Sequence, residues 1–252
     1  MKEYKNVDIL FLGSSHAYRG FDTEFFKQKG YSTFNLGSSA QTPTQTEVLL
    51  NRYLNDLNPK KIVFEIYPGS FENDGVESSI DLITNDKNDI HSLAMVLNMK
   101  HIKTLNSYIY AKQREILNLD KNFSEKKENK FDLYVDGGYV RRKPSEFDFY
   151  NYDSIPKKWK LREEQIEAFH RIINQLKAKN KEVILVYAPI TKINYQKFTN
   201  HTEFDSIIKS TSLQYLNFNS ILNLDDSYFY DYQHLNQKGV HSFNVALIDY
   251  IK

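Results

Sequence analysis

The N-terminal part of the chain alternates short apolar runs with amphipathic stretches, and this alternation constrains the fold more than any other feature. Each apolar run stops at glycine or at Pro-Gly; the runs are Val7–Leu12, Ser32–Leu36 and Lys61–Tyr67. The stretches between them, Thr23–Gly30 and Thr42–Leu57, have the spacing of helices. Short, continuously apolar strands separated by helices predict a parallel sheet that is buried on both faces. The carboxyl ends of such strands share one edge, where open α/β sheets carry their sites.

The same alternation returns toward the C-terminus. The pattern predicts a helix, a strand, a helix, a strand and a closing helix over Lys160–Lys179, Glu182–Tyr187, Glu203–Ser210, Leu213–Phe218 and Gly239–Ile251. We therefore predict an α/β fold, a three-layer α/β/α sandwich with a mainly parallel central sheet. The length of 252 residues suits one such domain, spanning residues 1–252.

The segment between the third and fourth predicted strands breaks the pattern. Ile80–Leu119 is predicted to be helical. Its aliphatic residues are expected on a buried face: Leu93, Val96, Leu97, Ile102, Leu105, Ile109 and Ile116. Asn118–Pro156 is polar, aromatic and rich in turn residues. We predict that residues 80–156 form a helical and loop insertion, or lid, within the domain rather than a domain of their own.

Composition excludes several classes of partner and chemistry. The chain has 33 basic and 32 acidic residues, a net charge of +1, so neither nucleic acid nor an anionic membrane is expected as partner. The absence of cysteine excludes disulfides, thiolate metal sites and cysteine nucleophiles. No apolar run approaches the ~20 residues of a membrane-spanning helix, and the polar start Met1–Asn6 does not resemble a signal peptide. Localisation stays open: cytoplasmic for the chain as written, cell envelope or extracellular for a piece of an anchored protein.

A serine-rich turn follows the first predicted strand. Gly13-Ser14-Ser15-His16 places a hydroxyl at the sheet edge, where its own backbone N–H can face a developing oxyanion. The alternatives are a helix N-cap and a phosphate-binding turn. His16 is adjacent to the serines, but neighbouring side chains in a turn rarely align for proton transfer. We therefore expect His16 to face the substrate or to support the site rather than to act as general base.

A second turn, near the C-terminus, carries an acid and a base. Asp231-x-x-His234 can place a carboxylate beside an imidazole, and an imidazole so oriented can take a proton from a serine hydroxyl. Leu235 is expected to anchor the turn in the core, and Asn236 to cap the last helix. The alternative is an ordinary loop with a solvated Asp and a surface His.

The remaining histidines have no comparable context: His91, His101, His170, His201 and His241. No set of His, Asp and Glu shows the spacing of metal ligands, so neither a metal nor another cofactor is expected.

Taken in order, these blocks resemble the SGNH (GDSL-type) hydrolase and acyltransferase superfamily. They are Gly13-Ser14-Ser15, Gly37 in Asn35-Leu36-Gly37-Ser38-Ser39, and Asp231-x-x-His234-Leu-Asn-x-x-Gly239. The resemblance implies that Ser15 is the nucleophile, His234 its base and Asp231 the orienting acid. It also implies that the backbone N–H groups of Ser15 and Gly37 hold the oxyanion. The fold it implies is the flavodoxin-like α/β/α sandwich already predicted.

The Gly-Ser-Ser start looks more like the branch of that superfamily that acts on cell-envelope polymers. This branch includes the D-alanyl transfer protein of teichoic acids and O-acyl-transfer proteins of exopolysaccharides. The family's Gly-x-Asn-Asp block, whose Asn donates to the oxyanion, is absent after the third strand. That place reads Glu65-Ile66-Tyr67-Pro68-Gly69-Ser70, and Tyr67 becomes a candidate substrate contact.

Three functional hypotheses follow. The resemblance implies a serine-dependent ester hydrolase or O-acyltransferase that forms an acyl-serine on an acyl ester of a carbohydrate or cell-envelope glycan. The second hypothesis is a weak or inactive module of the same fold that binds glycan or assists polysaccharide modification. The third is a nucleotide-binding domain that uses the Gly13–Ser15 turn, which leaves Asp231 and His234 without a role.

Two interpretations of the insertion stay open. In the first the insertion covers the site and binds glycan, and in the second it is a packed subdomain. Its aromatic residues, together with the nearby tryptophan, suit the first interpretation: Tyr134, Tyr139, Phe147, Phe149, Tyr150, Tyr152 and Trp159.

Overall fold

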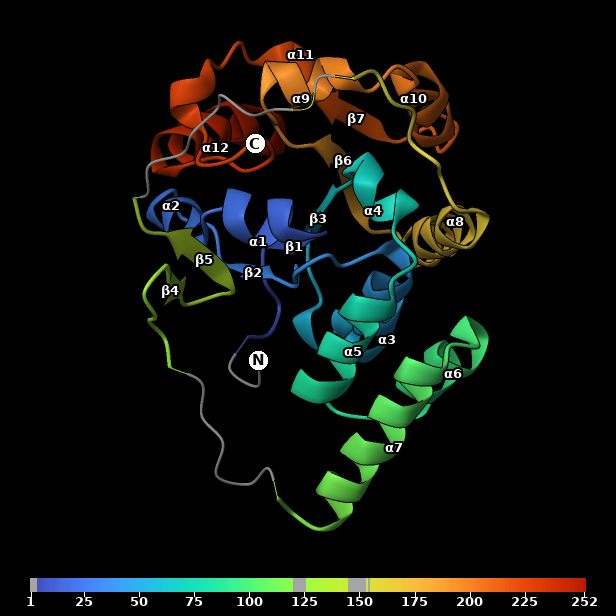
Figure 1. Ribbon diagram of the computed structural model, residues 1–252. Coiled ribbons are helices and arrows are strands. Elements are labelled where there is room, and N and C mark those ends of the chain that lie inside the picture. The colour runs from blue at the N-terminus through green and yellow to red at the C-terminus, as the bar shows by residue number, and fades with distance from the viewer. Residues whose placement is uncertain (1–3, 120–125, 145–152, 154) are drawn as a thin grey trace.

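A parallel sheet forms the centre of the molecule (Figure 1). The computed structural model describes residues 4–119, 126–144, 153 and 155–252. Within them the sheet has the order β2-β1-β3-β6-β7, and every neighbouring pair is parallel. The strands are β1 (Ile9–Leu12), β2 (Thr33–Asn35), β3 (Lys61–Glu65), β6 (Glu182–Tyr187) and β7 (Gln214–Asn217).

Both faces of the sheet are buried under helices. Leu10 and Leu12 of β1 point to a core shared with α3 (Pro43–Leu57) and α8 (Glu163–Ala178). Ile9 and Phe11 point to the opposite core, shared with α2 (Thr23–Gln28) and α12 (Gln237–Ile251). Successive strand residues face opposite sides of a sheet, so continuously apolar strands require a helical layer on each side. The predicted three-layer α/β/α architecture is confirmed.

Several short elements were not predicted. They are α1 (Ser15–Gly20), α4 (Pro68–Glu72), α9 (Lys192–Lys197), α11 (Phe218–Ile221) and the 3-10 turn Asp226–Tyr228. α10 (His201–Lys209) lies between α9 and β7, and α11 and the 3-10 turn join β7 to α12. Elements of three to six residues carry too little periodicity to be recognised without the tertiary structure.

The chain between β3 and β6 divides into helices and a hairpin. Three helices follow α4: α5 (Val76–Asn85), α6 (Ile90–Met99) and α7 (Ile102–Ile116). An antiparallel hairpin of β4 (Asp132–Val135) and β5 (Tyr139–Arg142) comes next. The helices extend the core beside α3, whereas the hairpin lies near α1 and α2 at the other end of the sheet (Figure 1). The sequence pattern predicted no strands in the stretch where this hairpin lies, and indicated only that it is rich in turn residues. That the whole chain forms a single domain stays a prediction.

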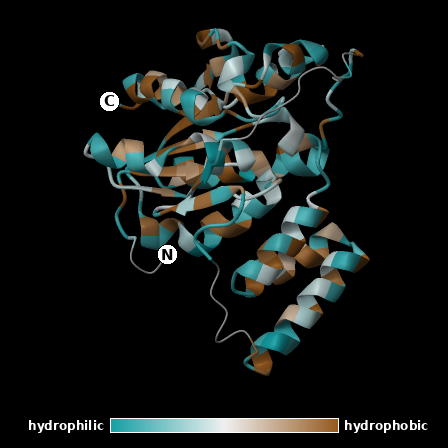
Figure 2. Ribbon diagram, turned by 60° about the vertical axis from the view of Figure 1, so that its left-hand side comes forward, coloured by the Kyte–Doolittle hydropathy of each residue, from teal (hydrophilic) through white to brown (hydrophobic). Residues whose placement is uncertain are grey.

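The prediction that the aliphatic residues of the helical segment form a buried face is wrong for α7. Thr104 and Ala111 are the residues that α7 buries, and it packs mainly against α5. The aliphatic side chains instead face outward. Figure 2 shows hydrophobic positions, in brown, along the ribbon of these helices. The exposed ones are Leu97, Ile102, Leu105, Ile109 and Ile116, whereas Val96 of α6 is buried as expected. Small inward residues let α5 and α7 approach closely, and the larger side chains are left on the opposite face.

The aromatic residues expected over the site lie in different places. Tyr139 is fully buried in the core beneath the hairpin, Trp159 is buried, and Tyr134 is exposed. The others, Phe147, Phe149, Tyr150 and Tyr152, lie outside the described residues. No helix in the described ranges is long and apolar enough to cross a bilayer.

Glycine is required where β1 ends. Gly13 has a φ of +135°, and a Cβ there would lie 2.7 Å from both Cβ and Oε2 of Glu65. We expect Gly13→Ala to lower the free energy of unfolding by about 2–4 kcal/mol, through backbone strain and overpacking. The shift of the urea midpoint measures this loss.

Gly30→Ala is the matched control for that change. Gly30 also has a positive φ, +88°, but a Cβ there meets nothing within 4 Å. It carries the strain without the clash, so its loss should be about 1–2 kcal/mol. Equal losses in the two variants would show that Glu65 does not crowd the turn.

Candidate active site

The serine turn joins β1 to α1. Ser14 is the N-cap of α1, and its hydroxyl accepts a hydrogen bond from the backbone N–H of His16 (3.4 Å). Ser15 is the first helical residue and is partly exposed. A capping serine followed by a second serine therefore fixes the start of the helix and leaves the Ser15 hydroxyl at the sheet edge.

The two turns predicted to carry the chemistry meet in space. Ser15 Oγ lies 2.8 Å from His234 Nε2. The other ring nitrogen, His234 Nδ1, lies 2.9 Å from Oδ2 and 3.0 Å from Oδ1 of Asp231. Ser15 and His234 are 219 positions apart in the chain. The contact arises because the first strand end and the last loop share one edge of the sheet.

Asp231 also builds the turn that it orients. Its Oδ1 accepts the backbone N–H groups of Gln233 (2.7 Å) and His234 (2.8 Å). Burial acts to raise the pKa of Asp231, but the hydrogen bond and charge of His234 and these N–H groups outweigh it, so the pKa is lowered. An ionised carboxylate beside Nδ1 favours the tautomer with hydrogen on Nδ1. Nε2 is then free to accept the Ser15 proton.

The acid–base turn is anchored at its C-terminal side. Leu235 is buried, and the Asn236 side chain accepts the N–H groups of Lys238 (3.0 Å) and Gly239 (3.2 Å) at the start of α12. Gly239 is required by close packing, since a Cβ there would lie 2.2 Å from the Tyr228 carbonyl oxygen. These contacts match the anchoring and capping roles expected of Leu235 and Asn236.

Gly37 is packed against the serine turn, but its N–H is already engaged. A Cβ at Gly37 would lie 3.0 Å from the Ser14 carbonyl oxygen. The Gly37 N–H donates to Asn35 Oδ1 (2.9 Å), and Asn35 Nδ2 in turn donates to the Ala17 carbonyl (2.9 Å). Ser15 N–H, in contrast, has no acceptor among the described residues. Of the two expected oxyanion donors, Ser15 N–H is the one that is unoccupied.

His16 is buried between other rings. It is 5% exposed and stacks on His234 (centroids 4.8 Å apart) and on Tyr67 (4.3 Å). Its Nδ1 lies 3.2 Å from Ser14 Oγ rather than on Ser15. Burial, followed by the proximity of His234, holds the pKa of His16 well below its usual value. His16 is therefore a neutral ring behind the base, and Tyr67 is also buried.

Sequence reasoning missed Glu65, the last residue of β3. It is 2% exposed, and its Oε2 accepts both the backbone N–H (3.1 Å) and the hydroxyl (3.0 Å) of Ser14. Burial raises its pKa from 4.5 to about 7, although the Ser14 hydrogen bonds act in the opposite direction. The signal in the sequence was a single glutamate within the apolar run Ile-Val-Phe-Glu-Ile-Tyr.

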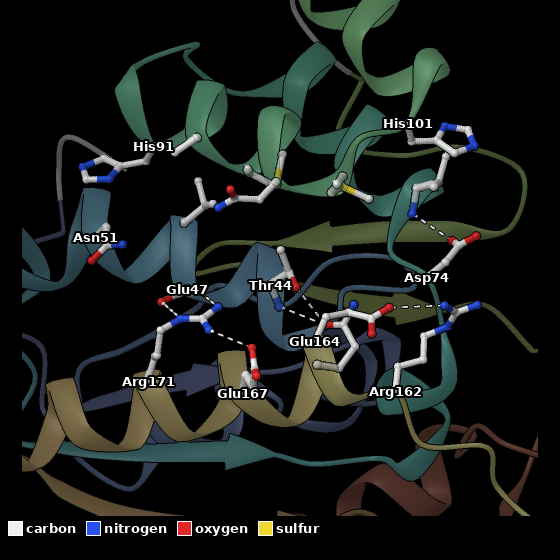
Figure 3. Close-up of a pocket in the computed structure, with 17 residues that line it drawn as sticks. Thr44, Glu47, Asn51, Asp74, His91, His101, Arg162, Glu164, Glu167 and Arg171 are labelled. Carbon is white, nitrogen blue, oxygen red and sulfur yellow. Dashed lines mark hydrogen bonds and ion pairs between the residues drawn. The ribbon is translucent and has the colours of Figure 1, made fainter.

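The cleft in Figure 3 is a different feature from this site. It has a volume of about 740 Å³ and lies where α3 and α8 face α6. Its arginines point to neighbouring carboxylates: Arg171 to Glu47 (2.8 Å), and Arg162 to Glu164 (3.2 Å). Ser15, Asp231 and His234 do not line this cleft. Among the described residues no group of three His, Asp or Glu side chains is placed to hold a metal ion.

Comparisons with known proteins found solved structures that this chain resembles. No protein-family model matches the chain, and no curated protein matches it. A solved structure from Streptococcus pneumonia, described as that of a "putative platelet activating factor", is similar over 98% of this chain and 85% of its own, with 11% identity and a TM-score of 0.50. A GDSL-like lipase from Bacteroides thetaiotaomicron matches over 100% and 89% (12% identity, TM-score 0.46). A psychrotrophic esterase from Pseudoalteromonas sp. matches over 96% and 94% (15% identity, TM-score 0.41).

The raised pKa of Glu65 predicts a dependence of stability on pH. Between pH 4.5 and about 7 only the folded carboxyl holds its proton, so unfolding releases it and the free energy of unfolding falls as pH rises. The loss over this window is about 3 kcal/mol. Glu65→Gln removes the titration while its amide oxygen can still accept from Ser14. We expect the pH dependence, measured by urea unfolding from pH 4.5 to 8, to be flatter by that amount in the variant.

Glu163→Gln serves as the control for this measurement. Glu163 is exposed in the first turn of α8, and its loss should leave the slope of stability against pH as in the wild type. An unchanged slope in Glu65→Gln would mean that the Glu65 carboxyl is ionised in the folded protein across this range.

Proposed function

We propose that the protein is a serine-dependent ester hydrolase or O-acyltransferase with Ser15 as nucleophile. One observation carries the proposal: Ser15 Oγ, His234 and Asp231 form a continuous series of contacts of 2.8–3.0 Å. The series has the nucleophile, base and orienting acid that acyl transfer requires. Together with the resemblance of the serine and histidine turns to those of the SGNH superfamily, it favours ester chemistry.

The reaction proceeds in two halves. Ser15 Oγ attacks the ester carbonyl while His234 Nε2 takes the hydroxyl proton, and Asp231 stabilises the resulting imidazolium. The tetrahedral intermediate collapses, the C–O bond of the ester breaks, and His234 returns the proton to the leaving alcohol. Water or a second hydroxyl then gives its proton to His234 and attacks the acyl-serine. The collapse of this second tetrahedral intermediate frees Ser15 and yields either an acid or a new ester.

Ser15 N–H is the first oxyanion donor in this proposal, and Gly37 N–H is the second. A negatively charged oxygen is a stronger acceptor than the Asn35 amide that holds Gly37 N–H in the absence of substrate. The Gly37 bond is therefore expected to pass to the intermediate. Removing one donor from an oxyanion hole typically lowers the rate by about 10²–10³-fold. The Gly37 N–H is expected to contribute a factor of this size to the rate.

The finer substrate assignment is an acyl ester of a carbohydrate or cell-envelope glycan. The Gly-Ser-Ser form of the nucleophile turn supports it, and so do the aromatic side chains of Tyr67 and Trp159 beside the acid–base turn. Transfer to a sugar hydroxyl and hydrolysis share every residue up to the second half-reaction.

An inactive glycan-binding module is the second candidate. The engaged Gly37 N–H and the absence of a Gly-x-Asn-Asp block favour it, because together they leave one free backbone donor at the expected oxyanion position.

Covalent labelling separates the two candidates. A fluorophosphonate probe should label the wild type and fail to label Ser15→Ala. With an aryl acetate, Ser15→Ala and His234→Ala should lower kcat by about 10⁴–10⁶-fold, and Asp231→Asn by about 10⁴-fold.

Ser107→Ala, on α7, is the control and should be labelled as fully as the wild type. A wild type that resists labelling would favour the inactive module, and equal labelling of wild type and Ser15→Ala would reject Ser15 as the nucleophile.

A further inference from the structure

A second pocket borders the acid–base turn. It has a volume of about 740 Å³ and is lined by Tyr67, Trp159, Tyr232 and Gln233, among others. Tyr232 and Gln233 are the two residues between Asp231 and His234. The Tyr232 carbonyl accepts hydrogen bonds from the N–H (3.2 Å) and hydroxyl (2.9 Å) of Thr191, which ties the turn to the segment after β6. The pocket therefore lies at the same edge of the sheet as Ser15.

The charge of this pocket is distinctive in a chain that is almost neutral. Four lysines line it, Lys157, Lys158, Lys160 and Lys197, against a single lining carboxylate, Glu72. The cleft of Figure 3 differs, because its arginines are paired with carboxylates.

Two of these lysines make no ion pair among the described residues, although the Glu72 carboxylate accepts the backbone N–H of Lys160 (3.2 Å). Asp153 pairs with Lys157 (3.1 Å) and with Lys197 (3.3 Å). Lys158 and Lys160, the two without an ion pair, are exposed. Two ammonium groups at one mouth repel each other, and an anion between them would remove that repulsion.

Trp159 lines the pocket, but its indole N–H is buried. Trp159 is 6% exposed, and its indole Nε1 is buried without a hydrogen-bond partner. Buried polar groups without a partner are rare in folded proteins, and an indole N–H can only donate. The backbone N–H and carbonyl of Trp159 are both held by the Asn200 side chain (2.9 and 3.0 Å), and its ring stacks on Phe198. The ring is thus rigidly placed.

We propose that this pocket binds an anionic group, a phosphate or a carboxylate, of the ester substrate. The inference rests on the proposed function, since it assigns a substrate class to that site. Lys158 and Lys160 supply the charge, and the rings of Trp159 and Phe198 contact the carbon skeleton. Acyl esters of negatively charged molecules are then preferred over neutral ones.

Matched pairs of acetyl esters test the preference. One pair is 1-acetylglycerol 3-phosphate and 1-acetylglycerol; the other is acetoxyacetate and acetoxyacetamide. We expect kcat/KM at low salt to be about tenfold or more higher for the charged member of each pair. This preference should shrink in about 0.5 M NaCl, because salt at that concentration screens the attraction strongly. Preference in one pair alone identifies the group as phosphate or as carboxylate.

Substitutions assign the effect to the pocket. Lys158→Gln and Lys160→Gln should each lower kcat/KM for the charged esters by about three- to tenfold and leave the neutral esters unchanged. Lys158→Arg should restore most of the loss. Lys209→Gln, an exposed lysine at the end of α10, is the control and should change neither. Equal losses for charged and neutral esters would overturn the proposal.

A binding measurement separates this proposal from the proposed function. Glycerol 3-phosphate should bind Ser15→Ala in calorimetry and fail to bind when Lys158→Gln and Lys160→Gln are added. An absence of binding of both glycerol 3-phosphate and glycolate, the carboxylate product of the second pair, to Ser15→Ala would overturn the anion pocket while Ser15 chemistry stands. Hydrolysis of both members of each pair at equal rates would do the same. Binding without ester turnover or probe labelling would retain the pocket and reject the enzyme.

Discussion

The buried carboxyl of Glu65 joins the ends of the two central strands. β1 and β3 pair in register, Leu12 opposite Phe64, and one residue later Glu65 receives both hydrogen bonds of Ser14. The carboxyl occupies the space where a side chain at position 13 would lie, so the turn needs glycine. Ser15 follows from that turn as the first residue of α1. The position of the proposed nucleophile therefore depends on a contact with a strand 51 positions away from Ser14.

The opposite half of the site depends on Asp231. A single carboxylate accepts two backbone N–H groups, which shapes the loop, and contacts the imidazole, which orients it. Thr191 holds the same loop from the β6 side through Tyr232. Because loop shape and ring orientation share one group, the base is held before any substrate arrives, as preorganised catalysis requires.

Much of this arrangement could be predicted from sequence. The continuous apolar runs before Gly13 and Gly37 identified the parallel strands, and the Asp231-x-x-His234 spacing identified an acid–base turn. The pairing of that turn with Ser15 came from the resemblance to the SGNH superfamily. Periodicity failed at α7, where the aliphatic stripe faces outward because Thr104 and Ala111 make the close contact. Periodicity also gave no indication that Glu65 is paired with Ser14, or that Trp159 lines one pocket with Tyr232 and Gln233. These depend on contacts between distant segments, which no local pattern encodes.

The β4–β5 hairpin has a consequence for the behaviour of the sheet as a whole. β2 is an edge strand, and open strand edges can pair with the edges of other molecules. The Gly137 carbonyl accepts the Asn35 N–H (2.7 Å), and Gly138 lies so close that a Cβ there would be 2.3 Å from the Asn35 carbonyl oxygen. The hairpin tip thus covers the end of this edge, next to Gly37. It limits intermolecular strand addition there, and so protects the protein from aggregating through the edge that carries its proposed oxyanion donor.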